Sequence, residues 1–281
     1  MTDDMPRARV GFIGLGSQGG PMARRIVEES YPLTLWARRR ASTDAFADTA
    51  AVVAGSPAEL GAASDLVCLC VVADADVEDV LLRPDGVLAG MAPGGVVVIH
   101  STIRPDTCRR IADEAAKRDI SVVDAPVSGG GGAAAERRLL VMAGGEEADV
   151  DRCRPVFETF ADPVIHLGPL GSGQLTKLLN NFVFTAQVGL ALDTFSFAER
   201  LGMDRAAVAQ VLGHGSGGSR AAAILSASGF DTAGLRQARS LLLKDVDIMR
   251  DVARTAEVTE PARLAQLAAH TLSLLNAPPT S

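Results

Sequence analysis

Between residue 9 and about residue 165, short apolar and β-branched runs alternate with stretches of helical periodicity. The runs lack the alternating polar residues of a strand with one face in water, so helices are expected on both faces of the sheet. Strand and helix in turn predict a Rossmann-type, doubly wound and mostly parallel α/β sheet. The predicted strands are 9–13, 33–36, 66–72, 96–99, 122–124, 139–143 and 164–166, with the last two closing the sheet.

The pattern changes after about residue 168. Residues 174–201 form one long helical stretch without proline, and Gly202 behind it is a C-cap signal. Further helices are predicted over 204–212, 235–254 and 261–275, with a flexible loop at 213–219 and no strand. The sequence therefore predicts a dinucleotide-binding domain over 1–166, followed by an all-α domain over 167–281 for substrate binding and dimerisation.

Composition excludes several classes of function. The net charge of −7 argues against a partner that is nucleic acid or a membrane surface. The apolar runs are far shorter than the roughly 18 residues of a membrane span, and no signal peptide is recognisable, so a cytoplasmic location is expected. Neither the four cysteines nor the histidines have the spacing of a metal site, and no metal is predicted.

A glycine-rich run follows the first predicted strand and opens a helix. In this position its glycines permit a tight turn, close approach of the backbone to a pyrophosphate, and helix–strand contact. The helix N-terminus then offers N–H groups and a positive dipole end to the phosphates. The run predicts a dinucleotide site with contacts from Gly14, Leu15, Gly16, Gln18 and Gly19.

The end of the second predicted strand bears on the choice of cofactor. Enzymes that prefer NAD commonly place an acid here for the ribose 2′-hydroxyl, whereas this chain has Ala37 followed by three arginines. Arg38 could pair with a 2′-phosphate, so NADP is favoured over NAD. In the alternative interpretation the arginines begin a solvated helix, and Arg38 only stacks on adenine.

Four separated segments, in order along the chain, resemble the β-hydroxyacid dehydrogenase family. That family includes 3-hydroxyisobutyrate dehydrogenase, tartronate semialdehyde reductase and glyoxylate/succinic semialdehyde reductase. A lesser match lies at 101–105. The four segments are 11–23, 124–130 with the following 139–145, 171–181, and Lys244-Asp245-Val246.

The resemblance implies that Lys177 is the general acid that protonates the alkoxide formed in carbonyl reduction, and the base in the reverse direction. A partly desolvated ammonium can have its proton affinity lowered toward neutrality. Asn181 lies four residues later on the same helix face and would bind substrate or orient the lysine. Without the other segments, Lys177 would be interpreted as a solvated charge on a helix.

The resemblance also assigns binding roles. Ser128, Gly129 and Gly130 would bind the substrate carboxylate, because a hydroxyl and unobstructed backbone N–H groups can converge on an anion. Thr102 would lie near the nicotinamide, and Lys244 would reach the cofactor or substrate. The alternatives are a flexible glycine loop at 128–132 and an exposed helix lysine at 244.

These observations predict an NAD(P)-dependent oxidoreductase that interconverts a small β-hydroxy acid and its semialdehyde or keto acid, acting as a homodimer or a higher homo-oligomer. Two alternatives remain: an imine reductase of related fold, and a non-catalytic dinucleotide-binding protein. Lys177 counts against both, because such proteins usually replace or lose it. Arg137 and Arg138 depart from the family pattern, so the loop after Ser128 is expected to differ in shape. The short C-terminus is a separate departure from that pattern.

Overall fold

The computed structural model describes residues 7–276, which form two compact units. The first extends to Lys177 and the second begins at Leu178. The sequence placed the second domain earlier, at residue 167. The difference arises because α8 (Ser172–Arg200) begins inside the first unit, where its first turn is held by buried contacts described below.

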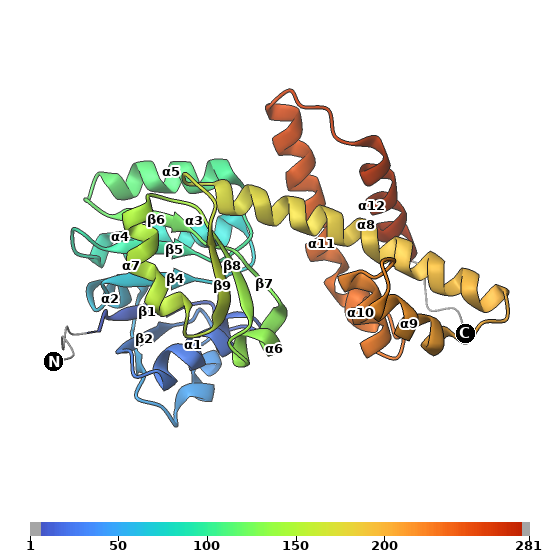
Figure 1. The fold of residues 1–281 in the computed structure, drawn as a ribbon. Helices are drawn as coiled ribbons and strands as arrows, with labels where there is room; N and C mark the ends of the chain where they lie inside the picture. The colour runs from blue at the N-terminus through green and yellow to red at the C-terminus, as the bar shows by residue number, and fades with distance from the viewer. Residues whose placement is uncertain (1–6, 277–281) are drawn as a thin grey trace. The chain divides into compact units, whose positions relative to one another are not determined.

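The first unit contains a six-stranded sheet in which every pairing is parallel. Its strand order, β3-β2-β1-β4-β5-β6, is that of a dinucleotide-binding doubly wound sheet. The predicted fold class is therefore confirmed (Figure 1). The strands are β1 (Val10–Ile13), β2 (Leu33–Trp36), β3 (Val52–Val53), β4 (Leu66–Leu69), β5 (Val96–Ile99) and β6 (Ser121–Asp124).

Alternate residues of each central strand enter two separate hydrophobic cores, as the period of two requires. Phe12 and Cys68 face one core, whereas Ile13 and Leu69 face the other. The first core includes side chains of α1 (Gly19–Glu28), η1 (Arg40–Phe46), α6 (Gly130–Ala135) and α7 (Glu147–Phe157). The second includes side chains of α2 (Pro57–Ala62), α3 (Asp74–Leu82), α4 (Val87–Gly90) and α5 (Pro105–Ala116).

The prediction that the last two strands close the first sheet is wrong. β8 (Leu139–Ala143) and β9 (Ala161–His166) form a second sheet with the two-residue β7 (Val127–Ser128), in the order β7-β8-β9. β7 runs antiparallel to β8, which turns this part of the chain away from β6. In the described chain, an antiparallel bridge from Asp124 to Gly144 joins the two sheets. The prediction failed because apolar periodicity alone carries no information about which sheet a strand joins.

All the described elements of the second unit are helices, and no strand follows β9 in the described chain, as predicted. α8 ends as expected: Gly202 has φ +75°, and the Met203 N–H donates to the Ala198 carbonyl. The flexible loop predicted at 213–219 is shorter, because α9 reaches His214, and a helix was missed behind it. The helices after α8 are α9 (Arg205–His214), α10 (Arg220–Ala227), α11 (Ala233–Thr255) and α12 (Ala262–Leu274).

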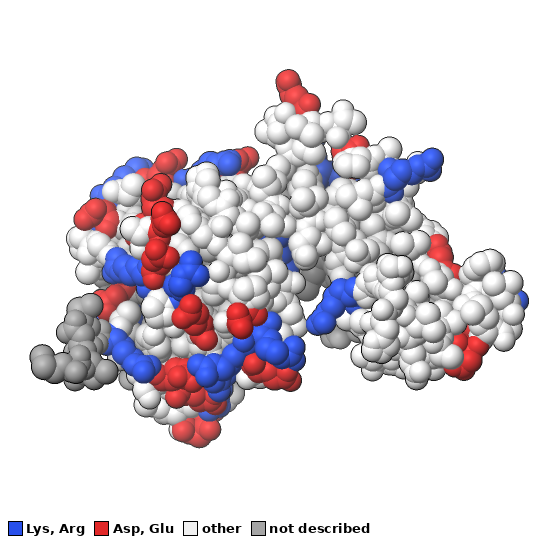
Figure 2. All heavy atoms as spheres, viewed as in Figure 1, with Lys and Arg blue, Asp and Glu red and all other residues white. Residues whose placement is uncertain are grey.

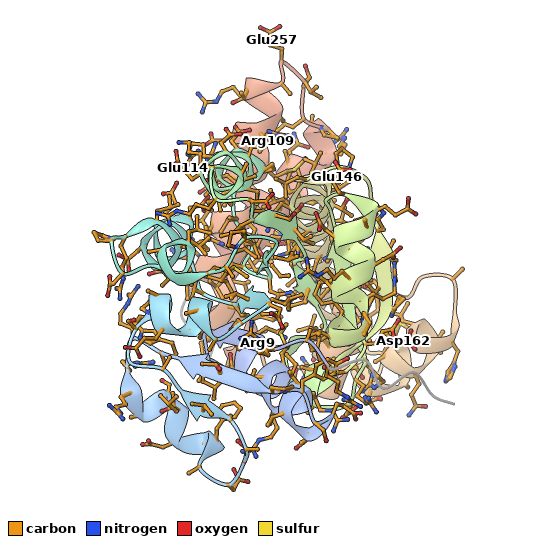
Figure 3. The ribbon with its side chains drawn as sticks, turned by 90° about the vertical axis from the view of Figure 1, so that its left-hand side faces the viewer. Arg9, Arg109, Glu114, Glu146, Asp162 and Glu257 are labelled. Carbon is orange, nitrogen blue, oxygen red and sulfur yellow. The ribbon has the colours of Figure 1, made fainter. Side chains whose placement is uncertain are left out.

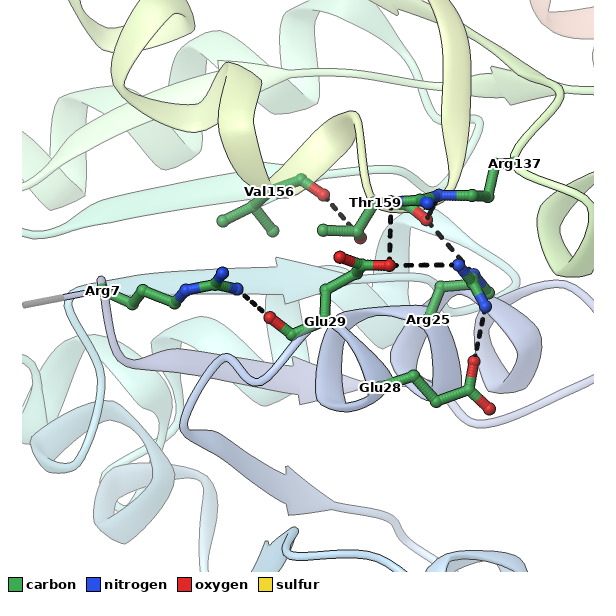
Figure 4. Close-up of polar contacts among 7 residues, drawn as sticks. All are labelled: Arg7, Arg25, Glu28, Glu29, Arg137, Val156 and Thr159. Carbon is green, nitrogen blue, oxygen red and sulfur yellow. Dashed lines mark hydrogen bonds and ion pairs between the residues drawn. The ribbon is translucent and has the colours of Figure 1, made fainter. Parts of the chain in front are cut away.

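Arg137, one of the departures from the family pattern, holds together elements at the C-terminal end of α1 (Figure 4). Its guanidinium lies 2.9 Å from a Glu29 carboxylate oxygen and donates to the Thr159 carbonyl at 3.2 Å. Arg25 contacts the same carboxylate and the same carbonyl. Arg137 therefore serves the packing of α1 against the turn before β9, at the opposite end of α1 from the glycine-rich loop.

Charge is mixed over the surface. Acidic and basic side chains are interspersed on the visible face of the first unit (Figure 2), and Arg109 and Glu114 project from α5 (Figure 3). Over residues 7–276, no helix combines the length and the apolar character needed to cross a membrane.

Candidate active site

The glycine-rich loop joins β1 to α1, and its glycines have separate structural tasks. Gly14 has φ +101°, and a Cβ there would collide with the Cys70 carbonyl at the end of β4. A Cβ at Gly19 would collide with the Gly14 carbonyl and lie 3.0 Å from the Phe12 ring. A Cβ at Gly16 would meet nothing within 4 Å, so the backbone there faces open space that a pyrophosphate could approach.

The N-terminus of α1 is suited to an anion. No acidic side chain lies in its first turn, and no side chain caps it; Gln18 occupies the N-cap position without such a bond. A helix end without an acidic cap keeps its partial positive charge for a phosphate. The residues present therefore fit a dinucleotide.

A groove of about 400 Å³ continues from this loop along the carboxyl ends of β1, β2 and β4. Arg38 contributes to its wall, but its guanidinium lies 2.8 Å from Asp76 of α3, and this hydrogen bond raises the pKa of Arg38. Asp76 was not predicted as a site residue. Its carboxylate lines the same groove as Ala37 and Arg38. The groove is lined by Ile13, Gly14, Leu15, Gly16, Trp36, Ala37, Arg38, Arg39, Ser42, Cys70, Val71, Val72, Asp76 and Val80.

The loop predicted to bind a carboxylate adjoins the glycine-rich loop. Ser128 is half-buried at the end of β7, and the next two glycines have φ of +135° and +78°. A Cβ at Gly130 would meet nothing within 4 Å, whereas one at Gly131 would collide with the Ser17 carbonyl. The structure thus packs the Ser128 loop directly against the predicted cofactor loop.

Asp124, at the end of β6, anchors the N-terminus of α8. One carboxylate oxygen accepts the Gly171 N–H and the other accepts the Gln174 N–H, both at 2.6 Å. A Cβ at Gly173 would lie 2.9 Å from that second oxygen, which explains the glycine between them. The carboxyl group is buried, and this burial raises its pKa to about 6 although the N–H donors act in the opposite direction.

Gln174 connects the same helical turn to the loop after β5. Its side-chain amide is fully buried; it donates to the Ser101 carbonyl at 2.8 Å and accepts the Ile103 N–H at 3.0 Å. Thr102, half-buried, lies between these two residues. This link was not predictable from the sequence, because a glutamine in a helix has no fixed partner along the chain.

Lys177 follows Gln174 by one helical turn and lies on the same face of α8. Lys177 is buried, with 9 % of the residue exposed, whereas Lys117 at the C-cap of α5 is an exposed, solvated lysine. A lysine with this degree of burial is a candidate for general acid catalysis.

In the second unit, Asn181 and Lys244 share one partner. The Asn181 side-chain amide donates to one oxygen of Asp245 at 2.6 Å, and the Lys244 ammonium lies 3.2 Å from the other. Asp245 is buried in α11 and belongs to the family-like segment Lys244-Asp245-Val246, but it was not predicted as a site residue. The Asn180 side-chain amide donates to the side-chain oxygen Oδ1 of Asn181 at 3.1 Å.

Comparison with known proteins agrees with this arrangement. A family model described as the NAD binding domain of 6-phosphogluconate dehydrogenase matches residues 9–168. A second, described as NAD-binding of NADP-dependent 3-hydroxyisobutyrate dehydrogenase, matches residues 171–278. The two models cover nearly the whole chain and indicate a nicotinamide dinucleotide cofactor.

Individual relatives point the same way. A probable 3-hydroxyisobutyrate dehydrogenase-like 3, mitochondrial, of Arabidopsis thaliana is 37 % identical over 217 residues, 77 % of this chain and 68 % of the relative. An NAD-dependent L-serine dehydrogenase of Pseudomonas aeruginosa is 30 % identical over 211 residues, 75 % and 71 % of the two chains. The solved 3-hydroxyisobutyrate dehydrogenase of Mycobacterium tuberculosis with L-serine superposes with a TM-score of 0.82 at 26 % identity, covering 96 % and 93 %. The chain is therefore an oxidoreductase that belongs to the 3-hydroxyisobutyrate dehydrogenase family.

Proposed function

We propose that the protein is an NADP-preferring dehydrogenase that interconverts a small β-hydroxy acid and its semialdehyde or keto acid. The observation that carries this proposal is Lys177, buried one turn beyond the anchored start of α8. The relatives named for 3-hydroxyisobutyrate and L-serine support the substrate class, because both compounds are carboxylic acids with a hydroxyl group on the β-carbon.

The residues divide the chemistry between them. A bound nicotinamide supplies the hydride in carbonyl reduction and accepts it in alcohol oxidation. Lys177 donates a proton from Nζ to the carbonyl oxygen as negative charge develops there, and its neutral amine removes the hydroxyl proton in the reverse direction. Ser128 and the N–H groups of Gly129 and Gly130 bind the substrate carboxylate, which orients the carbonyl carbon.

The remaining site residues complete the proposal. Thr102 contacts the nicotinamide end of the cofactor, and Asn181 binds substrate or orients Lys177. Lys244 contacts the cofactor or substrate. The hydrogen bond from Asn181 to Asp245 supports its role, because it fixes which way the amide points.

Substrate assays test the reaction class. The purified protein is given NADPH or NADH with glyoxylate, succinic semialdehyde, tartronate semialdehyde, methylmalonate semialdehyde or a cyclic imine. We expect turnover of at least one carbonyl substrate. Preferential turnover of the imine would favour an imine reductase, and binding of cofactor without any turnover would favour a non-catalytic protein.

The same assay tests Lys177. Lys177→Ala should lower kcat about 100-fold or more, the usual contribution of a general acid. The matched control is Lys117→Ala, because Lys117 is exposed at the C-cap of α5 and pairs only with Glu114 among the described contacts. Carbonyl turnover that survives Lys177→Ala nearly intact would contradict the mechanism.

The NADP preference is proposed from Ala37 and Arg38. A 2′-phosphate can replace Asp76 as the partner of Arg38 through charge-assisted hydrogen bonds. Arg38→Ala should lower kcat/KM for NADPH about 10-fold or more and leave that for NADH nearly unchanged. Arg24→Ala is the control, because Arg24 pairs with Asp48 and lies outside the groove. Equal efficiency of the unaltered protein with NADH and NADPH would contradict the preference.

We also propose a homodimer. Leu190 and Phe197 of α8, and Leu201 directly after its end, are 54–61 % exposed. Their spacing of seven and four places them along one side of the helix. Exposed apolar stripes of this kind usually mark an interface. Sedimentation or light scattering should give twice the mass of one chain, and a monomer would refute the proposal.

The cytoplasmic location is likewise a proposal. It is supported by the absence of a membrane-crossing helix from the described chain, while two Arabidopsis relatives are named as mitochondrial. Fractionation of cells that express the protein is the direct test.

A further inference from the structure

Gln174 is held from both its main chain and its side chain. Its N–H donates to Asp124 at 2.6 Å, so the start of α8 is fixed to the end of β6. Its amide group spans Ser101 and Ile103, so the loop after β5 is fixed to α8. No other described side chain is shown bonding to both of these loop residues, and no solvent reaches the amide.

The loop itself is also tied to the sheet. The Ser101 hydroxyl accepts the Val71 N–H at 2.8 Å, just beyond the end of β4. Thr102, between the two residues that Gln174 holds, therefore has little freedom of position. On the other side, Lys177 extends from the helical turn that follows Gln174. Gln174 thus lies between the proposed nicotinamide contact and the proposed proton donor.

We propose that Gln174 is a positioning residue, which fixes the Thr102 loop and the first turn of α8 to one another and so sets where the Lys177 ammonium meets the reacting oxygen. This inference rests on the proposed function, because it gives Gln174 a purpose only if Lys177 transfers the proton.

A purely structural role is the competing explanation, since a buried amide that satisfies two backbone groups also stabilises the fold. The two explanations differ in one measurable way. A structural residue lowers stability independently of Lys177, whereas a positioning residue affects kcat only while Lys177 is present.

The first measurement uses Gln174→Met, which preserves length and removes both side-chain hydrogen bonds. We expect kcat to fall about 10- to 100-fold, because small misplacements of reacting groups have effects of that size. The dissociation constant for NADPH should change less than about 2-fold, since Gln174 does not line the cofactor groove.

Ser64→Ala is the matched control. Ser64 is buried before β4, at the amino ends of the parallel strands and away from the carboxyl ends where the site lies, and its hydroxyl donates to the Leu60 carbonyl at 2.7 Å. The control should lower the melting temperature and leave kcat unchanged. If Gln174→Met does not fold, Gln174→Glu is used, because it keeps the acceptor for Ile103 and loses only the donor to Ser101.

The deciding measurement is a double-mutant cycle with Lys177→Ala. Gln174→Met should change kcat less than about 2-fold in the Lys177→Ala background, against the 10- to 100-fold loss in the unaltered protein. An equal loss in both backgrounds, or an unaltered kcat in folded Gln174→Met, overturns the inference alone. Undiminished turnover by Lys177→Ala overturns the proposed function, and this inference with it.

Discussion

Two glycines of the same loop have opposite requirements at the level of single residues. Gly14→Ala places a side chain at φ +101° and against the Cys70 carbonyl. It should lower the free energy of unfolding by more than about 1 kcal/mol. Gly16→Ala meets no neighbour within 4 Å and should change it by less than about 0.5 kcal/mol.

Among folded variants, Gly16→Ala should weaken cofactor binding more than Gly14→Ala does. The Cβ of Gly16→Ala enters the space in which the pyrophosphate is expected, so the dissociation constant for NADPH should rise about 10-fold or more. Urea unfolding and fluorescence titration measure the two quantities separately. Unchanged affinity in Gly16→Ala would place the pyrophosphate elsewhere.

At the level of elements, two buried titratable groups lie where β5 and β6 end. His100 is enclosed by the rings of Phe12, Phe157 and Phe160, and its Nδ1 lies 2.7 Å from the Ala125 carbonyl. Burial lowers the pKa of His100 from 6.5 to about 4, whereas burial raises the pKa of Asp124 from 3.8 to about 6.

The two shifts have opposite effects on stability. Between about pH 4 and 6 the folded protein binds more protons at Asp124 than the unfolded chain does, so this group lowers stability as pH rises. At His100 the unfolded chain binds more protons, so this group raises stability as pH rises. Each effect is about 3 kcal/mol, and together they nearly cancel.

Single substitutions should separate these effects. Asp124→Asn removes the effect of the Asp124 carboxyl group. Between pH 4 and 6.5, the free energy of unfolding of this variant should therefore rise by about 3 kcal/mol more than that of the unaltered protein. His100→Asn removes the effect of the His100 ring and should reverse the sign. Urea unfolding at several pH values is the measurement. Identical slopes in both variants and the unaltered protein would refute the assignment.

The elements that sequence predicted best are those whose local signals are strong. The long α8, its end at Gly202 and the strands β1, β2, β4, β5 and β6 were correctly expected. β3 and β7 are only two residues long, too short for a periodic signal. α10 was missed because it is a short alanine-rich helix behind a glycine-rich loop, although Ser219 caps it by accepting the Ala222 N–H.

The candidate site was predictable only in part. Gly14, Gly16 and Gly19 form a local glycine-rich pattern that a sequence reveals. Asp76, Gln174 and Asp245 act on residues far away in the chain, and nothing in their own neighbourhoods indicates those partners. Long-range hydrogen bonds depend on the completed fold.

At the level of the whole molecule, the two units should respond differently to cofactor. Every residue that lines the groove belongs to the first unit. Hydrogen exchange with saturating NADPH should show increased protection at residues 14–19, 37–42 and 70–72, because ligand binding suppresses local opening. Peptides from α9 and α10 should change little. Strong protection confined to α9 and α10 would contradict this prediction, because it would place the cofactor in the second unit.

The carboxylate of Asp124 has a consequence for how the protein handles negative charge. The start of a long helix ordinarily binds anions well, because its N–H groups are free to donate. Here the Asp124 carboxylate already accepts hydrogen bonds from the N–H groups of Gly171 and Gln174. The negative charge of Asp124 therefore offsets the partial positive charge at the start of α8 and disfavours the binding of a second carboxylate there. Under the proposed function, the substrate carboxylate therefore binds at the Ser128 turn and not at the start of α8.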